Sequence, residues 1–177
     1  MTQTTAPAIR TWCAAGERAD ADAAVGSTSF DVVLISALTE QFRFSGRDAL
    51  HGVLQAAFKQ IHGIRFDDVV GGDQTYGLFY TAQLGDQPLQ EAQLIRLDAD
   101  GLINEITLFI RPLPALAALM AGLGPALARH DDRPTLARFL TAATAPLAAI
   151  TRFGDKRIVP LAASQKAAPG RTPARSD

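Results

Sequence analysis

The chain has a single cysteine, Cys13, among its 177 residues. One thiol cannot form an intramolecular disulfide, and no second cysteine is present to complete a zinc site. The spacings HxH, HExxH and CxxC are also absent, and the three histidines, His51, His62 and His130, are far apart in sequence. These absences predict a protein without a bound metal, and no motif in the chain points to a cofactor.

An excess of charge of one sign is missing as well. The 17 basic residues nearly balance the 18 acidic residues, which gives a net charge of −1. The chain therefore has no overall attraction to nucleic acid or to an anionic membrane. Residues 1–10 lack the basic and apolar regions of a signal peptide, and prolines and glycines interrupt the uncharged stretch 112–128. We expect a cytoplasmic protein with neither nucleic acid nor membrane as a partner.

The residues that are present change in character along the chain. Hydrophobic residues make up 47% of the sequence, which is ordinary for a folded protein, and most of the aromatic ones lie between Trp12 and Phe109. Alanine and leucine, which favour helices, then dominate as far as Phe153. No large apolar residue follows Leu161. We expect a folded domain over 6–112, a helical extension over 113–154 and a disordered tail over 162–177.

Hydrophobic spacing predicts helices and then strands. A helix around Trp12 and a short helix from Asp20 are expected first, and a capping pair, Ser45 and Asp48, precedes a longer helix. One apolar stripe marks this longer helix: Leu50, Val53, Leu54, Ala57, Phe58 and Ile61. Apolar runs separated by turn residues predict five strands, over 30–36, 64–70, 76–84, 89–97 and 102–110.

This order of elements predicts an α+β fold, in which the helices cover one face of a curved and mainly antiparallel sheet. In the extension we expect two helices. The first would bury a stripe of Leu113, Leu116, Ala117 and Met120, and Gly122 and Gly124 would interrupt the helical structure.

The element order and three segments carry a resemblance to a known superfamily. The segments are TWCAAGERADADAAV, the strand FDVVLIS leading into FSGRDALHGVLQAAF, and the hairpin LIRLDADGLINEITLF. They resemble the NTF2-like superfamily and, within it, the SnoaL-like group. The resemblance implies a cone-shaped α+β barrel whose mouth holds a small apolar ligand, but it does not by itself assign a reaction.

Ketosteroid isomerases of this superfamily use a carboxylate base opposed by a tyrosine and a protonated acid. The matching positions here are Ser36, Trp12 and Gln93. A serine hydroxyl is not a base near pH 7 and tryptophan has one N–H, so isomerase chemistry of that type is not expected. Glu40 and Glu91 are the next candidates for a general acid or base, with solvated strand-end charges as the alternative reading.

The resemblance and the strand periodicity also indicate a ligand-binding set. Alternation along the strands turns Gln93 into the cone, where it either orients a ligand carbonyl or satisfies backbone groups. The aromatic residues either line a cavity or fill a core. The full set expected to bind a ligand is Trp12, Ser36, Phe58, Tyr76, Tyr80, Gln93 and Leu108.

Two functions of different classes remain open at this point. The first is a pocket protein that binds a hydrophobic metabolite, with cofactor-free acid/base catalysis of the isomerase, cyclase or hydrolase type as its expected chemistry if it is an enzyme. The second is a non-catalytic binding protein whose cone is packed solid. Phe79 and Phe109 are expected on the outer face of the sheet, where an uncovered apolar patch predicts a homodimer.

Overall fold

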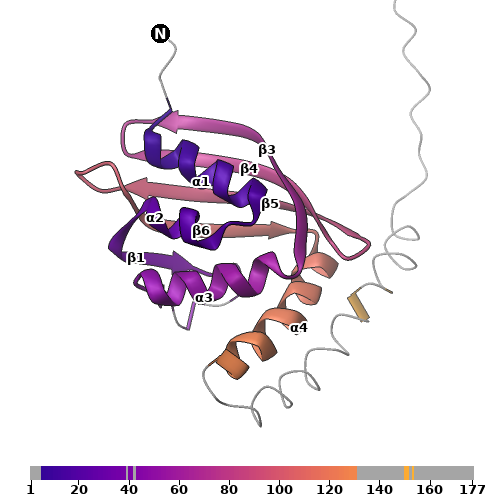
Figure 1. Ribbon diagram of the computed structural model, residues 1–177. Helices are drawn as coiled ribbons and strands as arrows, with labels where there is room; N and C mark the ends of the chain where they lie inside the picture. Colours follow the sequence, from indigo (N-terminus) through magenta and orange to yellow (C-terminus); the bar gives the residue numbers. More distant parts are fainter. Residues whose placement is uncertain (1–4, 39, 42, 131–149, 152, 154–177) are drawn as a thin grey trace, which may run out of the picture.

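Helices cover one face of a six-stranded sheet in this protein (Figure 1). The computed structural model describes residues 5–38, 40–41, 43–130, 150–151 and 153. The helices are α1 (Pro7–Arg18), α2 (Ala21–Gly26), α3 (Arg47–Phe58) and α4 (Leu113–His130). The strands are β1 (Thr28–Ile35), β2 (Phe44–Ser45), β3 (Ile61–Gly72), β4 (Thr75–Leu84), β5 (Gln87–Leu97) and β6 (Ile103–Arg111).

The sheet has the strand order β2-β1-β6-β5-β4-β3. Neighbouring strands run antiparallel except β1 and β6, which are parallel. The last four strands form a meander, as the turn residues between the apolar runs predict. At the β3–β4 turn, Gly71 has φ +111° and a Cβ there would lie 2.3 Å from the Thr75 carbonyl oxygen, so this turn requires glycine. The predicted α+β class and its mainly antiparallel curved sheet are confirmed.

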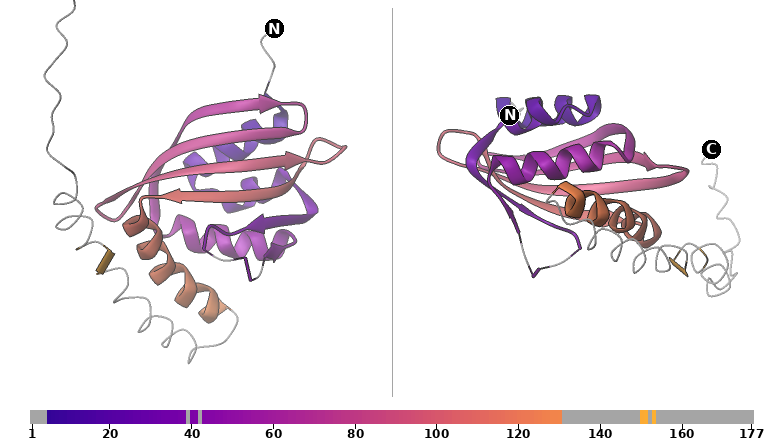
Figure 2. Two further views of the ribbon diagram at one scale, coloured as in Figure 1. Left: turned by 180° about the vertical axis from the view of Figure 1, so that it is seen from behind. Right: turned by 60° about the horizontal axis from the view of Figure 1, so that its bottom comes forward.

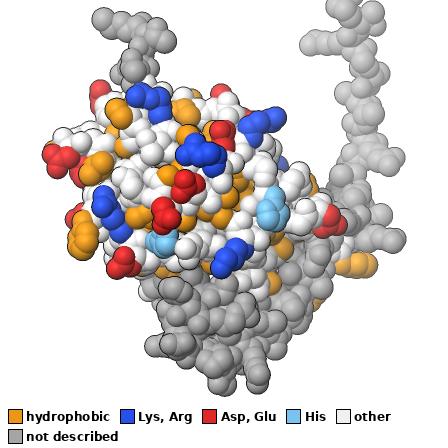
Figure 3. Space-filling view, viewed as in Figure 1, with side chains coloured by type: hydrophobic (Ala, Val, Ile, Leu, Met, Phe, Trp, Pro, Cys, Tyr) orange, Lys and Arg blue, Asp and Glu red, His pale blue; other side chains and the backbone are white. Residues whose placement is uncertain are grey.

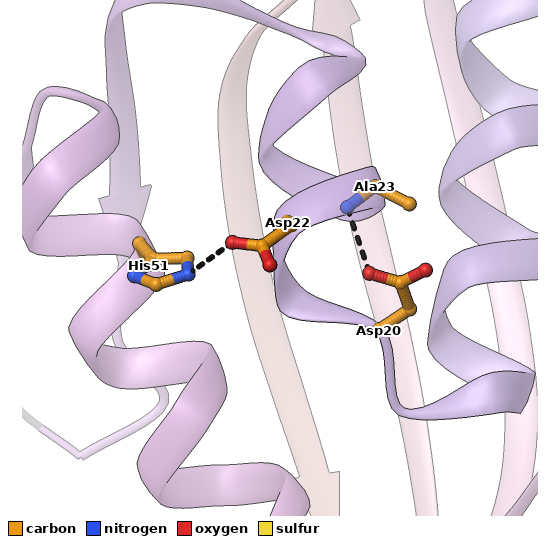
Figure 4. Close-up of polar contacts among 4 residues, drawn as sticks. All are labelled: Asp20, Asp22, Ala23 and His51. Carbon is orange, nitrogen blue, oxygen red and sulfur yellow. Dashed lines mark hydrogen bonds and ion pairs between the residues drawn. The ribbon is translucent and has the colours of Figure 1, made fainter.

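Local signals explain the first two helices. Pro7 stands in the first turn of α1, where its missing N–H costs nothing. The helix ends at Ala19, which adopts a left-handed conformation. Asp20 then caps α2, because its side chain accepts a hydrogen bond of 2.9 Å from the Ala23 N–H (Figure 4).

The ends of α3 differ from the prediction. Ser45 does not cap this helix, because it belongs to β2 and pairs with Val33 of β1. Gly46, with φ +85°, is the residue before the helix and makes no side-chain cap. Ile61 does not extend the helical stripe either. It begins β3 and pairs with Leu84 of β4, so the helix has already ended at Phe58.

The core lies between the helices and the inner face of the sheet. Its largest fully buried residues include Ile9 of α1, Leu50 of α3, and Leu78 and Ile95 of the central strands. The strands bury alternate residues, as their periodicity predicts. No helix among the described residues crosses the opposite face of the sheet (Figure 2).

Helix α4 follows β6 and packs against α3 and the strands β4, β5 and β6. It runs through Gly122 without the expected interruption. Gly122 lies against the end of the Gln60 side chain, which would have to move to make room for a Cβ at that position. None of the described helices combines the length and hydropathy that a membrane crossing needs.

The buried stripe of α4 matches the predicted one only in part, because Ala117 is buried as predicted but other positions differ. Leu113 is 64% exposed, whereas Ala115 and Leu119 are buried in a second apolar cluster with Leu84 and Leu89. The helix therefore turns Ala115 and Leu119 inward, on a face that the predicted stripe did not include. Most of the second predicted helix and the predicted tail over 162–177 lie outside the described residues. The division into a domain over 6–112 and an extension over 113–154 stays a prediction.

Candidate functional site

A cavity of about 80 Å³ lies between the helices and the inner face of the sheet. Its wall is apolar except for the hydrogen-bonding groups of Trp12, Tyr80, Glu91 and Gln93. The apolar residues of the wall are Gly16, Ala24, Leu34, Val53, Leu54, Ala57, Phe58, Ile61, Ile64, Phe66, Leu108, Ile110, Leu119 and Leu123. Pockets for drug-sized ligands have volumes of about 300–1,000 Å³, and a cavity of about 150 Å³ holds benzene. The cone is therefore not packed solid, but the space in this conformation suits only a ligand of a few atoms.

Glu91 and Gln93 enter this cavity from β5. They are two residues apart on one strand, so both side chains leave the same face, and both residues are buried. Gln93 Nε2 donates a hydrogen bond of 2.7 Å to Glu91 Oε1. Trp12 Nε1, on α1, donates a hydrogen bond of 2.8 Å to Gln93 Oε1. Trp12, Gln93 and Glu91 thus form one chain of hydrogen bonds that runs from indole to carboxyl.

Tyr80 approaches Glu91 from the neighbouring strand. The two residues are directly paired in the β4–β5 ladder, and the Tyr80 hydroxyl donates a hydrogen bond to the Glu91 carboxylate. The Tyr80 ring packs edge-on against Phe66, with ring centroids 5.2 Å apart. Burial, and then the negative charge of Glu91, raise the pKa of Tyr80 well above its ordinary value. Tyr80 consequently stays protonated and remains a hydrogen-bond donor.

The carboxyl of Glu91 has an unusual protonation equilibrium. Burial raises the pKa of Glu91 from 4.5 to about 7, while the hydrogen bonds from Gln93 and Tyr80 act in the opposite direction. Both the acid and the carboxylate are therefore populated near neutral pH. A group with such a pKa is suited to accept a proton and to return it within one reaction cycle.

The remaining groups of the wall limit which ligand the cavity can hold. Among the residues that the structure describes, Glu91 and Tyr80 are the titratable ones of the wall, and no lysine, arginine or histidine belongs to it. The Trp12 N–H is already occupied by Gln93, so a ligand meets the ring of Trp12 rather than a free donor. An apolar cavity with one ionisable carboxyl and no cation favours a neutral ligand.

The structure brings together most of the residues predicted to bind a ligand. Five of them belong to the cavity wall: Trp12, Phe58, Tyr80, Gln93 and Leu108. The other two lie outside the wall. The Ser36 hydroxyl accepts a hydrogen bond of 3.1 Å from the Leu38 N–H, and Tyr76 is part of the buried core.

The two candidate carboxylates have different surroundings. Glu91 is 6% exposed and lies in the cavity wall, whereas Glu40 is exposed and does not belong to it. The sequence contained a signal for this difference, because Glu91 has the same strand parity as Gln93 and Ile95. Sequence reasoning missed Phe66 and the α4 residues Leu119 and Leu123. For α4 no comparable signal exists, since periodicity does not tell where a helix docks.

A polar contact outside the cavity joins α2 to α3. His51 Nε2 lies 2.8 Å from Asp22 Oδ1, and the Asp22 side chain is 92% exposed (Figure 4). This pair lies at the surface. Within the part of the chain that the structure describes, no group of three or more histidine, cysteine, aspartate or glutamate residues could hold a metal ion. Charges of both signs are mixed over this helix-bearing side of the molecule (Figure 3).

The outer face of the sheet carries a second depression, of about 470 Å³. Phe79 and Phe109 border it and are 43% and 56% exposed. Asp68 and Arg111 also border it. We call this depression, which spans β3 to β6, the outer groove.

Comparisons with known proteins find relatives among solved structures alone, since no family model and no curated protein matches the chain. An uncharacterised protein with a cystatin-like fold from Silicibacter pomeroyi is 21% identical, with a TM-score of 0.68 over 78% of this chain and 96% of its own. A steroid delta-isomerase from Pseudomonas aeruginosa is 20% identical, with a TM-score of 0.64 over 71% and 92%. An NTF2-like protein of unknown function from Cytophaga hutchinsonii is 12% identical, with a TM-score of 0.53 over 66% and 97%. The chain therefore has the NTF2-like fold that the resemblance implies.

Proposed function

We propose that this protein is a cofactor-free enzyme that transfers a proton on a small, neutral, hydrophobic metabolite, with Glu91 as the general acid/base. One observation carries the proposal: a buried carboxyl stands in the wall of an otherwise apolar cavity, and its hydrogen-bond partners among the described residues are Gln93 and Tyr80. Structural proteins rarely bury a carboxyl without a cation beside it, because burial favours neutralisation of the charge.

The proposed reaction is a proton shift next to a carbonyl group. The Glu91 carboxylate takes a proton from the carbon beside the carbonyl, and the electrons of the broken C–H bond move into an enolate. Glu91, now protonated, returns the proton to another carbon or oxygen of the same molecule, so that the product is an isomer. Such general acid/base catalysis contributes about 10² to 10⁴ in rate.

Gln93 supports this step through its second amide hydrogen. One Nε2 hydrogen is used by Glu91, and the other is free to hydrogen bond a ligand oxygen. This role agrees with the carbonyl-orienting function expected for Gln93. The steroid delta-isomerase that shares the fold is a protein of the same reaction class, but the similarity in fold does not itself assign the reaction.

The size of the cavity restricts the substrate or requires movement of the wall. Leu119 and Leu123 of α4 close one part of the cavity. We propose that larger metabolites enter when α4 shifts, because the remaining wall belongs to the sheet and to α1–α3, which share the main core. In the present conformation the favoured ligands have the size of acetone or butanone.

We also propose that the protein forms a homodimer through the outer groove. Phe79 and Phe109 provide an apolar centre, and Asp68 and Arg111 provide opposite charges beside it. A twofold axis through such a face can place Arg111 of one subunit near Asp68 of the other, so the surface is complementary to a second copy of itself. The cavity inside the cone supports a catalytic dimer over the alternative of a packed, non-catalytic dimer.

Exchange of hydrogen for deuterium tests the proposed reaction. Acetone and butanone are incubated with the protein in D₂O, and loss of the α-proton signals is followed by NMR. We expect faster exchange with the wild-type protein than in buffer, and exchange at the buffer rate with Glu91→Gln. Glu40→Gln is the matched control and should exchange as the wild type does. Equal exchange by Glu91→Gln and wild type would show that Glu91 is not the acid/base.

A further inference from the structure

Gln93 is held in one orientation by its two neighbours. Its side-chain amide has a carbonyl end, which accepts hydrogen bonds, and an NH₂ end, which donates them. Trp12 has only an N–H to offer, so it must meet the carbonyl end. The NH₂ end then faces Glu91. The reverse orientation would bring two donors together in a site where Trp12 and Gln93 are 4% and 7% exposed.

The orientation of the Gln93 amide decides whether the carboxylate or the neutral acid of Glu91 finds a hydrogen-bond partner in it. An N–H directed at Glu91 stabilises the carboxylate, because the carboxylate is an acceptor only. A carbonyl oxygen directed at Glu91 would instead accept a hydrogen bond from the O–H of the neutral acid, and would therefore stabilise the protonated form. The Tyr80 hydroxyl can donate a hydrogen bond to the carboxylate or to the neutral acid. It therefore does not favour one protonation state as the Gln93 amide does.

We propose that Trp12 is a positioning residue that sets the protonation state of Glu91 by fixing the orientation of the Gln93 amide. This inference rests on the proposed function only for its biological meaning, since Glu91 titrates whether or not it catalyses a reaction. It also explains the presence of tryptophan at a position where a ligand donor is expected from the resemblance. The indole donor serves Gln93, and its effect reaches the ligand through Glu91.

The other groups around Glu91 do not supply this selection. Tyr80 approaches from β4, and the neighbours from β6 and α4 in the cavity wall are aliphatic. Charged residues occur in the outer groove, which Tyr80 and Glu91 also border: Asp67, Asp68 and Arg111. They remain in place in every variant proposed below, so their influence cancels in the comparison.

The titration of Glu91 can be followed directly by NMR. The chain's glutamates are Glu17, Glu40, Glu91 and Glu105, and labelling their side-chain carboxyl carbons with ¹³C gives a small set of signals. The signal absent from Glu91→Gln belongs to Glu91. We expect Trp12→Phe to raise the titration midpoint of Glu91 by about one pH unit, the size expected for loss of a hydrogen bond to a charged group.

Two further variants separate positioning from packing. Gln93→Met removes the amide and should raise the midpoint of Glu91 as well. If Trp12 acts through Gln93, the double variant that combines Trp12→Phe with Gln93→Met should have the same Glu91 titration midpoint as Gln93→Met alone. Ile9→Val changes the packing of the same helix, α1, at a fully buried residue outside the cavity wall and the hydrogen-bond chain, and it should leave the midpoint unchanged.

A substitution that keeps the shape of the indole guards against loss of folding in Trp12→Phe. Trp12 is the single tryptophan, so it can be replaced during expression by benzothienylalanine, in which sulfur stands in place of the ring N–H. This replacement should raise the midpoint as Trp12→Phe does. An unchanged midpoint, or shifts of Trp12→Phe and Gln93→Met that add in the double variant, would overturn the proposal. Absence of ketone exchange with an intact midpoint shift would overturn the proposed function alone.

Discussion

Gln93 Nε2 donates to Glu91 Oε1 over 2.7 Å, and the two side chains leave the same face of β5. Alternation along the strand thus places the Glu91 carboxyl beside the Gln93 amide, whose orientation selects the protonation state of Glu91 in our proposal. Trp12 on α1 and Tyr80 on β4 complete the arrangement from either side. The site therefore depends on packing of the first helix against the sheet as well as on the sheet itself.

Glu91 should make the stability of the protein depend on pH. Its pKa is about 7 in the folded protein and 4.5 when unperturbed, so between these values the unfolded chain binds fewer protons than the folded one. The free energy of unfolding contributed by Glu91 is then highest below pH 4.5 and falls as the pH rises to 7. The expected loss is on the order of 3 kcal/mol.

Chemical denaturation of the wild type and Glu91→Gln between pH 4.5 and 8 measures this effect. The stability of Glu91→Gln relative to the wild type should increase across the range, because glutamine has no charge to bury. Glu105→Gln, on the outer face of the sheet, is the control for loss of a carboxylate. A difference between the Glu91 variant and the wild type that stays constant with pH would mean that Glu91 is not buried in its charged form.

Isomerisation of a β,γ-unsaturated ketosteroid should be negligible with this protein. A steroid is far larger than the cavity of about 80 Å³, and neither Ser36 nor Glu40 belongs to the cavity wall. The measurement is the change in ultraviolet absorbance on conjugation of the ketone. If turnover clearly exceeds the buffer rate, comparison of Glu40→Gln, Glu91→Gln and Ser36→Ala would identify the base and show that the wall opens widely.

Five of the six strands of this fold could be predicted from the sequence, and so could part of the cavity wall, whereas the short β2 was missed. Each predicted strand is bounded by turn residues. A period of two sorts its side chains into two faces, and the resemblance to the NTF2-like superfamily then assigns Tyr80 and Gln93 to the inner face. The same period includes Glu91, but its charge favoured a solvated position. Its burial depends on Tyr80 of another strand and on Gln93, whose orientation depends in turn on Trp12. Such a chain of contacts across three elements has no counterpart in local sequence.

Leu119→Ala should enlarge the cavity and destabilise the protein. Leu119 is 4% exposed and belongs to the cavity wall, so its truncation should cost about 2–5 kcal/mol in the free energy of unfolding. It should also strengthen the binding of ketones larger than butanone, such as cyclohexanone, measured by the fluorescence of Trp12. Leu113→Ala makes the same change at an exposed position of α4 and should alter neither quantity. Equal effects of the two substitutions would contradict the role assigned to α4.

Phe109→Glu should convert the proposed homodimer to a monomer. The substitution places a charge at the centre of the outer groove, where a second copy is expected to bury the ring. Light scattering measures the mass in solution. Phe30→Glu is a matched control, because Phe30 is 84% exposed and does not border the outer groove, and it should leave the mass unchanged. A monomeric wild type would rule out the proposed contact.

The pH dependence of ketone exchange tests the central claim about Glu91 most directly. The rate of deuterium incorporation into acetone is measured with the wild-type protein from pH 4 to 9 and corrected for the buffer reaction. The account predicts a rate that rises as Glu91 ionises, with a midpoint near 7, and no enzyme-dependent rate in Glu91→Gln. A midpoint near 4.5, or a rate that persists in Glu91→Gln, would contradict it.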